Sequence, residues 1–266
     1  MKVAAIQHDI VWEDPAATRT HVRPLIARAA GAGARLIVLP EMFATGFSMR
    51  PERVAEDEGG PSEQFLLEQA ATHDAFVLAS IAQRGADGRY RNNAVLARPD
   101  GGTARYAKIH PFSYAGEHEH YAAGEQFCTV ELDGLRVSLF VCYDLRFADE
   151  FWALAPQTDV YAVPANWPSP RHEHWRALLR ARAIENQAYV VGVNRVGPAR
   201  DLPHSGGSVL LDPMGIVLAE GDDREAVLLG EIDAAEVRRI RTEFPFLADR
   251  RGIGSNSARS RFRDDE

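Results

Sequence analysis

Short, continuous apolar runs alternate with longer stretches of mixed polarity in the first third of the chain. The runs have the length and content of buried strands, whereas the mixed stretches have the spacing of helices. Ser62 is the expected N-cap of the second helix. This alternation of strand and helix favours a layered α/β fold. The strands are expected at residues 2–7, 36–39 and 75–81, and the helices at residues 15–30 and 62–73.

After residue 90 the pattern changes, because strands begin to follow one another directly. Two antiparallel hairpins are predicted, the first over residues 91–98 and 103–108 and the second over residues 127–132 and 135–141. The total reaches about a dozen strands, more than a strongly twisted open sheet usually holds, so two packed sheets are expected. The remaining strands are predicted at residues 160–163, 189–193, 208–211, 216–218 and 227–232, and the helices at 147–154, 175–187 and 234–242.

Length, charge and cysteine content restrict the class of protein. A chain of 266 residues can form one large core, so we expect a single domain over residues 1–250, followed by an extended or disordered tail over 251–266. The net charge of -8 argues against a nucleic-acid partner. No apolar run approaches the ~20 residues of a membrane span. The two cysteines favour a reducing cytoplasm, and neither they nor His118 and His120 have the spacing of a metal site.

Three reactive side chains follow the ends of predicted strands. Glu41 comes after the strand at 36–39, Lys108 ends a hairpin strand, and Cys142 follows the strand at 135–141. Each has an ordinary structural explanation when taken alone: a solvated loop acid, an exposed edge lysine and a small buried hydrophobe. Ligands collect at such strand ends in α/β proteins. If these three ends lie on one edge, an acid, a cation and a thiol meet there.

The sequence around these residues resembles the signature blocks of the nitrilase superfamily of carbon-nitrogen hydrolases, in the family's order. The resemblance covers residues 2 to about 248. It implies a four-layer αββα sandwich of two mixed sheets flanked by helices, a homodimer or higher homo-oligomer, and no cofactor. The blocks are Leu39-Pro-Glu41-Met-Phe-Ala-Thr-Gly46, Tyr106-Ala-Lys108-Ile-His110 and Val141-Cys142-Tyr-Asp-Leu-Arg-Phe147.

The mechanism that the resemblance implies makes Cys142 a nucleophile that forms a thioester and releases ammonia. Lys108 and the amino end of the following helix are expected to favour its thiolate. Glu41 is the expected general base and acid, and Lys108 with the backbone N–H of Tyr143 is expected to stabilise the oxyanion. Glu117 fits the position of the family's second glutamate and is expected to hydrogen-bond Lys108.

Five further residues are candidates for substrate binding. Phe112, Asn166 and Trp167 are expected to line the pocket, although aromatic residues at strand ends also serve in packing. Arg146 and Arg171 suit either a substrate carboxylate or a structural ion pair. The expected partner of this pocket is a small-molecule amide.

Other motifs look like the omega-amidase-like branch of the superfamily, which implies hydrolysis of 2-oxoglutaramate or 2-oxosuccinamate. An aliphatic amidase and a nitrilase of the same superfamily are the alternatives. A non-catalytic amide-binding or scaffold protein is a further alternative, but its signature would be loss of a reactive residue, and all three are present. The motifs are Glu117-His-Glu-His-Tyr121, Asn166-Trp-Pro168, His174-Trp175, Glu185-Asn-Gln187 and Phe244-Pro-Phe246.

Overall fold

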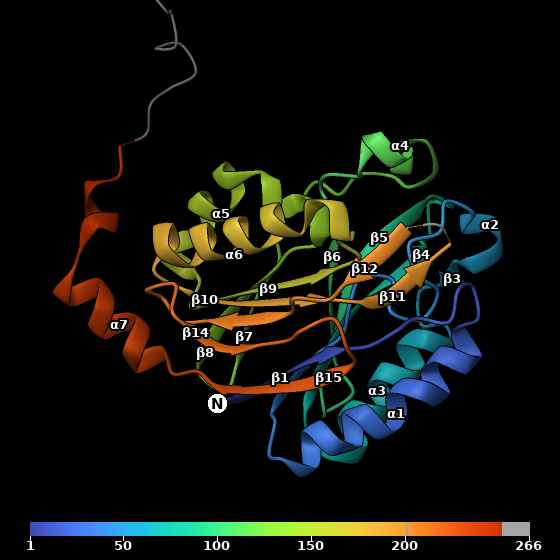
Figure 1. Cartoon of the computed structure of the whole chain (residues 1–266), viewed down its shortest axis with the longest axis horizontal. Helices are drawn as coiled ribbons and strands as arrows, with labels where there is room; N and C mark the ends of the chain where they lie inside the picture. Colours follow the sequence, from blue (N-terminus) through green and yellow to red (C-terminus); the bar gives the residue numbers. More distant parts are fainter. Residues whose placement is uncertain (201, 252–266) are drawn as a thin grey trace, which may run out of the picture.

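Two mixed β-sheets form the centre of the structure, and helices cover their outer faces (Figure 1). The structure, a computed structural model, describes residues 1–200 and 202–251. Each sheet contains both parallel and antiparallel neighbours. The predicted four-layer αββα sandwich is therefore confirmed. The tail predicted for residues 251–266 lies, except for Arg251, outside the described residues.

The first sheet has the N-terminal strand next to one of its edges and two helices on its outer face (Figure 1). Its strand order is β15 (Ala226–Glu231), β1 (Lys2–Gln7), β2 (Leu36–Val38), β4 (Phe76–Arg84), β5 (Tyr90–Ala97) and β6 (Thr103–Ala107), with β3 (Glu56–Asp57) beside β4. The outer helices are α1 (Pro15–Gly31) and α3 (Pro61–His73), and the short α2 (Pro51–Val54) precedes β3.

The second sheet lies between the first sheet and helices α5 (Ala148–Leu154) and α6 (His172–Asn186) (Figure 1). Its strand order is β14 (Val217–Glu220), β13 (Val209–Leu211), β10 (Tyr189–Asn194), β9 (Val160–Ala165), β8 (Leu135–Leu139) and β7 (Thr129–Leu132). A separate hairpin is formed by β11 (Val196–Ala199) and β12 (Leu202–Ser205), and α7 (Ala234–Glu243) follows β15.

The two faces of β1 explain why its four central residues are all apolar. Val3 and Ala5 belong to the core between the two sheets, whereas Ala4 and Ile6 pack with the residues of α1. Successive side chains of a strand point to opposite faces, so a strand covered on both sides loses the polar half of the usual pattern. Lys2 begins this strand, and its ammonium group donates to the carbonyl of Ala32 at 3.0 Å.

Three local predictions need correction. The N-cap of α3 is Gly60 rather than Ser62, because Pro61 begins the helix and the Ser62 hydroxyl donates to Glu56. No helix or strand was predicted between residues 108 and 127, but this segment contains the single-turn helix α4 (Glu117–His120). The β11–β12 hairpin was not predicted, since Pro198 and Pro203 reduce its resemblance to a strand pair. Among the described residues, none of the helices has the length and apolar content needed to cross a bilayer.

Candidate active site

The turns that follow β2, β6 and β8 bring the three reactive side chains together. Glu41 stands three residues after β2, Lys108 directly after β6, and Cys142 three residues after β8. The ammonium of Lys108 lies 2.8 Å from Glu41, and the same carboxylate is near enough to the Cys142 thiol to raise its pKa. The expected meeting of an acid, a cation and a thiol at one edge is therefore observed.

Both carboxylate oxygens of Glu41 have defined partners. Oε1 accepts hydrogen bonds from Lys108 Nζ and Asn92 Nδ2, each at 2.8 Å. Oε2 accepts from the backbone N–H of Asn166 at 2.9 Å. The side chain is fully buried. Its geometry is thus fixed by the protein, as a general base requires.

Glu117 forms the other side of the cluster. Its Oε2 accepts from Lys108 Nζ at 2.8 Å and from the backbone N–H of Phe112 at 2.5 Å. Its Oε1 accepts from Asn92 Nδ2 at 3.0 Å. The expected hydrogen bond between Glu117 and Lys108 is present, whereas Glu119, two residues along α4, is exposed.

Burial and neighbouring charges act in opposite directions on these groups. Burial alone lowers the pKa of Lys108, but Glu117 and Glu41 outweigh it, and the pKa is raised. Lys108 is therefore a permanent cation rather than a base. Burial raises the pKa of Glu117, and Glu41 adds to the effect while Lys108 opposes it. One ammonium group thus serves two closely spaced carboxylates.

Cys142 begins a tight turn of five residues with a positive φ of 46°, a conformation uncommon outside glycine. Burial and the nearby Glu41 raise the pKa of its thiol well above the usual range, and Lys108 only partly offsets them. Of the two expected sources of thiolate stabilisation, Lys108 lies close enough to lower the pKa, whereas α5 begins only at Ala148, six residues after Cys142.

A small cavity opens beside Cys142. Its volume is about 20 Å³, which is room for roughly one water molecule. The carbonyl oxygen Oδ1 of Asn166 is buried and has no hydrogen-bond partner among residues 1–200 and 202–251, so it is available to a ligand. The lining includes all five expected substrate-binding residues: Phe112, Arg146, Asn166, Trp167 and Arg171, together with Cys142, Tyr143 and Pro168.

The two arginines of this lining are held by aromatic rings rather than by carboxylates. The guanidinium carbon of Arg146 lies 4.8 Å from the centroid of the Trp167 ring, and that of Arg171 lies 5.5 Å from that of Phe112. Within the described part of the chain, no ion pair involves Arg146 or Arg171. The structural ion pair considered from the sequence is therefore absent there, and both charges are available at the cavity.

Asn92 is a residue of the cluster that sequence reasoning missed. It lies on β5 and is 1% exposed, and its amide nitrogen contacts both Glu41 and Glu117. One signal could have identified it: Asn92 and Asn93 are adjacent polar residues within a strand whose other inner positions are apolar.

Asp144 is a second residue that the sequence did not single out. Its carboxylate accepts from the backbone N–H of Val141 at 2.9 Å and from the Tyr106 hydroxyl at 2.8 Å. It also accepts from the backbone N–H of His110 at 2.9 Å. This single side chain joins the turn that carries Cys142 to the segment that carries Lys108.

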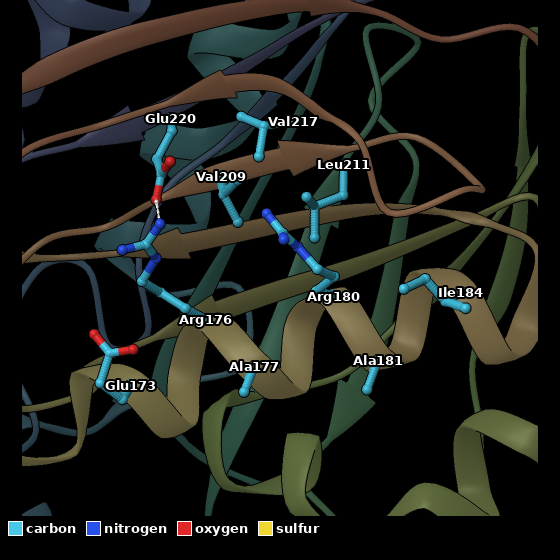
Figure 2. A pocket seen from close by; sticks show the side chains of 10 residues that line it. All are labelled: Glu173, Arg176, Ala177, Arg180, Ala181, Ile184, Val209, Leu211, Val217 and Glu220. Carbon is cyan, nitrogen blue, oxygen red and sulfur yellow. Dashed lines mark ion pairs between the residues drawn. The ribbon is translucent and has the colours of Figure 1, made fainter.

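A much wider groove lies elsewhere, between α6 and strands β13 and β14 (Figure 2). Its volume is about 560 Å³, and it is lined by small apolar side chains with charged residues at its rim. The Arg176 and Glu220 side chains form an ion pair across it at 3.1 Å. It contains no cysteine or histidine, so this groove lacks the groups of a nucleophilic site. We refer to it as the α6 groove.

Comparison with known proteins identifies the family of this chain. The family model described as "Carbon-nitrogen hydrolase" matches residues 2–242. An omega-amidase YafV of Yersinia enterocolitica is 39% identical, with 94% of this chain and 96% of that protein covered. A 2-oxoglutaramate amidase of Bacillus subtilis (strain 168) is 33% identical, with 93% and 96% covered.

A solved structure shares the fold of almost the whole chain. The protein XC1258 of Xanthomonas campestris, described as a CN-hydrolase superfamily protein with an arsenic adduct in the active site, superposes with a TM-score of 0.90. It is 35% identical, and the alignment covers 95% of this chain and 98% of that chain. The chain therefore belongs to the carbon-nitrogen hydrolase family, within the nitrilase superfamily, and is an amidase.

Proposed function

We propose that this amidase is an omega-amidase, which hydrolyses the terminal amide of 2-oxoglutaramate or 2-oxosuccinamate and releases ammonia. The observation that carries the proposal is the pair of arginines, Arg146 and Arg171, at a cavity that also contains Cys142. Two guanidinium groups without carboxylate partners suit a substrate that has a carboxylate beyond its amide. The names of the relatives from Yersinia and Bacillus support the same substrate class.

The proposed reaction begins when Glu41 takes the thiol proton of Cys142 and the sulfur attacks the amide carbon. The carbonyl electrons move to oxygen, and the oxyanion is stabilised by the ammonium of Lys108 and the backbone N–H of Tyr143. When the tetrahedral intermediate collapses, the C–N bond breaks and Glu41 returns the proton to the departing ammonia. A thioester on Cys142 remains.

The second half of the reaction uses the same groups. Glu41 removes a proton from a water molecule, and the resulting hydroxide attacks the thioester carbon. The C–S bond then breaks, the carboxylic acid leaves, and the thiol regains its proton from Glu41. Glu117 holds the ammonium of Lys108 at 2.8 Å throughout, which keeps the cation in place while charge develops.

Substrate entry requires movement at the cavity. A volume of about 20 Å³ is far smaller than a five-carbon amide needs. Arg171 and Phe112 stack on one another at this cavity, and neither is fully buried. We propose that a substrate carboxylate draws Arg171 away from the ring, which opens the cavity and binds the substrate in one step.

The test is ammonia release by purified wild-type protein and by Arg171→Ala, with Arg176→Ala as a matched control in the α6 groove. Loss of a charge-assisted hydrogen bond should lower kcat/KM for 2-oxoglutaramate by about 10- to 100-fold. Hydrolysis of butyramide, which has no carboxylate, should not be slower in either variant than in the wild type. Equal losses on both amides would contradict the proposed recognition, and preference for a nitrile would contradict the omega-amidase activity.

We also propose that the chain is a single domain that forms a homodimer or higher homo-oligomer in the cytoplasm. The core between the two sheets draws residues from both, which supports one domain. Both cysteines are free, as a reducing compartment requires.

The proposed interface between subunits lies beside the α6 groove. Ile184 and Ile216 are 47% and 60% exposed there, and exposed apolar side chains of this size support an interface. Sedimentation velocity of Ile184→Asp should give a smaller species than the wild type, and an unchanged species would contradict this interface.

A further inference from the structure

Two carboxylates lie close together in the cluster, and both are buried. Lys108 Nζ is 2.8 Å from Glu41 and 2.8 Å from Glu117, so one cation faces two potential anions. Like charges in a buried site raise each other's affinity for protons. The two carboxylates therefore need a hydrogen-bond donor besides Lys108 if they are to lie side by side in a buried site.

Asn92 occupies the position that such a group requires. Its Nδ2 donates to Oε1 of Glu41 at 2.8 Å and to Oε1 of Glu117 at 3.0 Å. A side-chain amide has two N–H donors, so each carboxylate receives one. Asn92 thus neutralises part of both charges without adding a titratable group.

The orientation of this amide is fixed by its other end. Oδ1 of Asn92 accepts from the hydroxyl of Ser80 at 2.8 Å, and that hydroxyl oxygen accepts from the backbone N–H of Met42 at 2.7 Å. Because the Ser80 hydroxyl already accepts from a backbone donor, its own proton is directed to the amide oxygen. The nitrogen of Asn92 must then face the carboxylates. The Asn92 carbonyl also accepts from the backbone N–H of Lys108 at 2.9 Å.

We propose that Asn92 is a positioning residue of the hydrolysis, which favours the ionised form of Glu117 and directs Oε2 of Glu41 toward Cys142. Lys108 and Asn92 together occupy Oε1 of Glu41. The other oxygen, which accepts from the Asn166 N–H, is the one left for the thiol. This inference rests on the proposed role of Glu41 as general base.

The charges around the pair agree with this role. Burial raises the pKa of Glu117 and Glu41 raises it further, whereas Lys108 and the hydrogen bond from Asn92 lower it. The Cys142 thiol also faces Glu41, and its pKa is raised by burial and by that carboxylate. Loss of the amide would therefore leave the cluster holding protons at a higher pH.

The test compares Asn92→Ala with Asn93→Ala, the neighbouring asparagine of β5. Asn93 is also buried, but its amide donates to Gln83 at 3.0 Å and faces the other side of the strand. In Asn92→Ala, kcat should fall by about 10- to 100-fold with little change in KM. The midpoint of the acidic limb of the pH–kcat/KM profile should move to higher pH. Asn93→Ala should keep the wild-type profile.

A second readout does not depend on turnover of any amide. The rate of alkylation of Cys142 by iodoacetamide, followed by peptide mass, should shift along the pH axis in Asn92→Ala and not in Asn93→Ala. An unshifted profile in folded Asn92→Ala, or the same shift in Asn93→Ala, would overturn the role of Asn92. A wild-type protein that releases no ammonia would instead contradict the proposed function, and the alkylation profile would still decide the inference.

Should Asn92→Ala fail to fold, Ser80→Ala provides the alternative. This variant keeps Asn92 but removes the hydroxyl that fixes its amide, which frees the group to rotate. A smaller shift of the acidic limb in the same direction supports the inference. A wild-type profile in Ser80→Ala overturns it.

Discussion

The α6 groove is the larger of two hollows, whereas the cavity at Cys142 is small but holds the reactive groups. The groove has a volume of about 560 Å³ and the cavity about 20 Å³, yet the reactive groups lie at the cavity. Its three charged neighbours, Glu41, Lys108 and Glu117, are each at most 1% exposed. Burying charges is costly, so such clusters are retained where they serve chemistry. Convergent buried charge therefore identifies this site better than volume does.

Ion pairs show the same contrast. Arg176 and Glu220 of the α6 groove have side chains that are 46% and 33% exposed, and such pairs contribute ~0–1 kcal/mol to stability. Removing one partner of a buried pair leaves an uncompensated charge and costs about 3–5 kcal/mol. Substitutions in the two regions should thus differ in activity and in stability.

The largest effect is expected for Cys142→Ala, which removes the proposed nucleophile. Ammonia release should fall by ~10⁴-fold or more, because loss of a nucleophile removes the covalent pathway. The thermal unfolding midpoint should change little, since alanine fits the space of the thiol. Cys128→Ala is the matched control, and comparable activity in the two variants would refute covalent catalysis.

A smaller effect on turnover is expected for Lys108→Ala. Removing an oxyanion donor typically lowers kcat by ~10²–10³, and KM should change less. The same substitution leaves Glu41 and Glu117 without their shared cation, so the free energy of unfolding should fall by about 3–5 kcal/mol. Urea unfolding and steady-state kinetics check the two parts, and a purely structural Lys108 would leave kcat of the folded fraction unchanged.

The smallest effect is expected for Arg176→Ala in the α6 groove. Loss of this exposed ion pair should lower the free energy of unfolding by less than about 1 kcal/mol. Its kcat on any amide should stay within roughly twofold of the wild type, as is usual for exposed sites away from the chemistry. A large loss of activity in this variant would remove the functional distinction between the groove and the cavity.

The sequence predicted most strands of the fold because apolar runs of strand length mark buried β-structure directly. It predicted Glu41, Lys108 and Cys142 because each lies in a short local motif. Asn92 escaped because its role depends on partners that are 51 and 25 residues away along the chain. The burial that raises the pKa of the Cys142 thiol escaped prediction for a related reason, since burial and the distance to α5 follow from the folded structure alone.

Lys2 and the active site lie at opposite ends of the parallel strands β1 and β2, which matters for immobilising the protein. Only two of the 30 basic residues are lysines, Lys2 and Lys108, and the second is buried. Lys2 begins β1, which runs parallel to β2, whereas Glu41 follows the far end of β2. Coupling of lysine amines to a solid support would therefore attach the chain at the edge opposite Cys142. The immobilised enzyme would present its cavity to the solution.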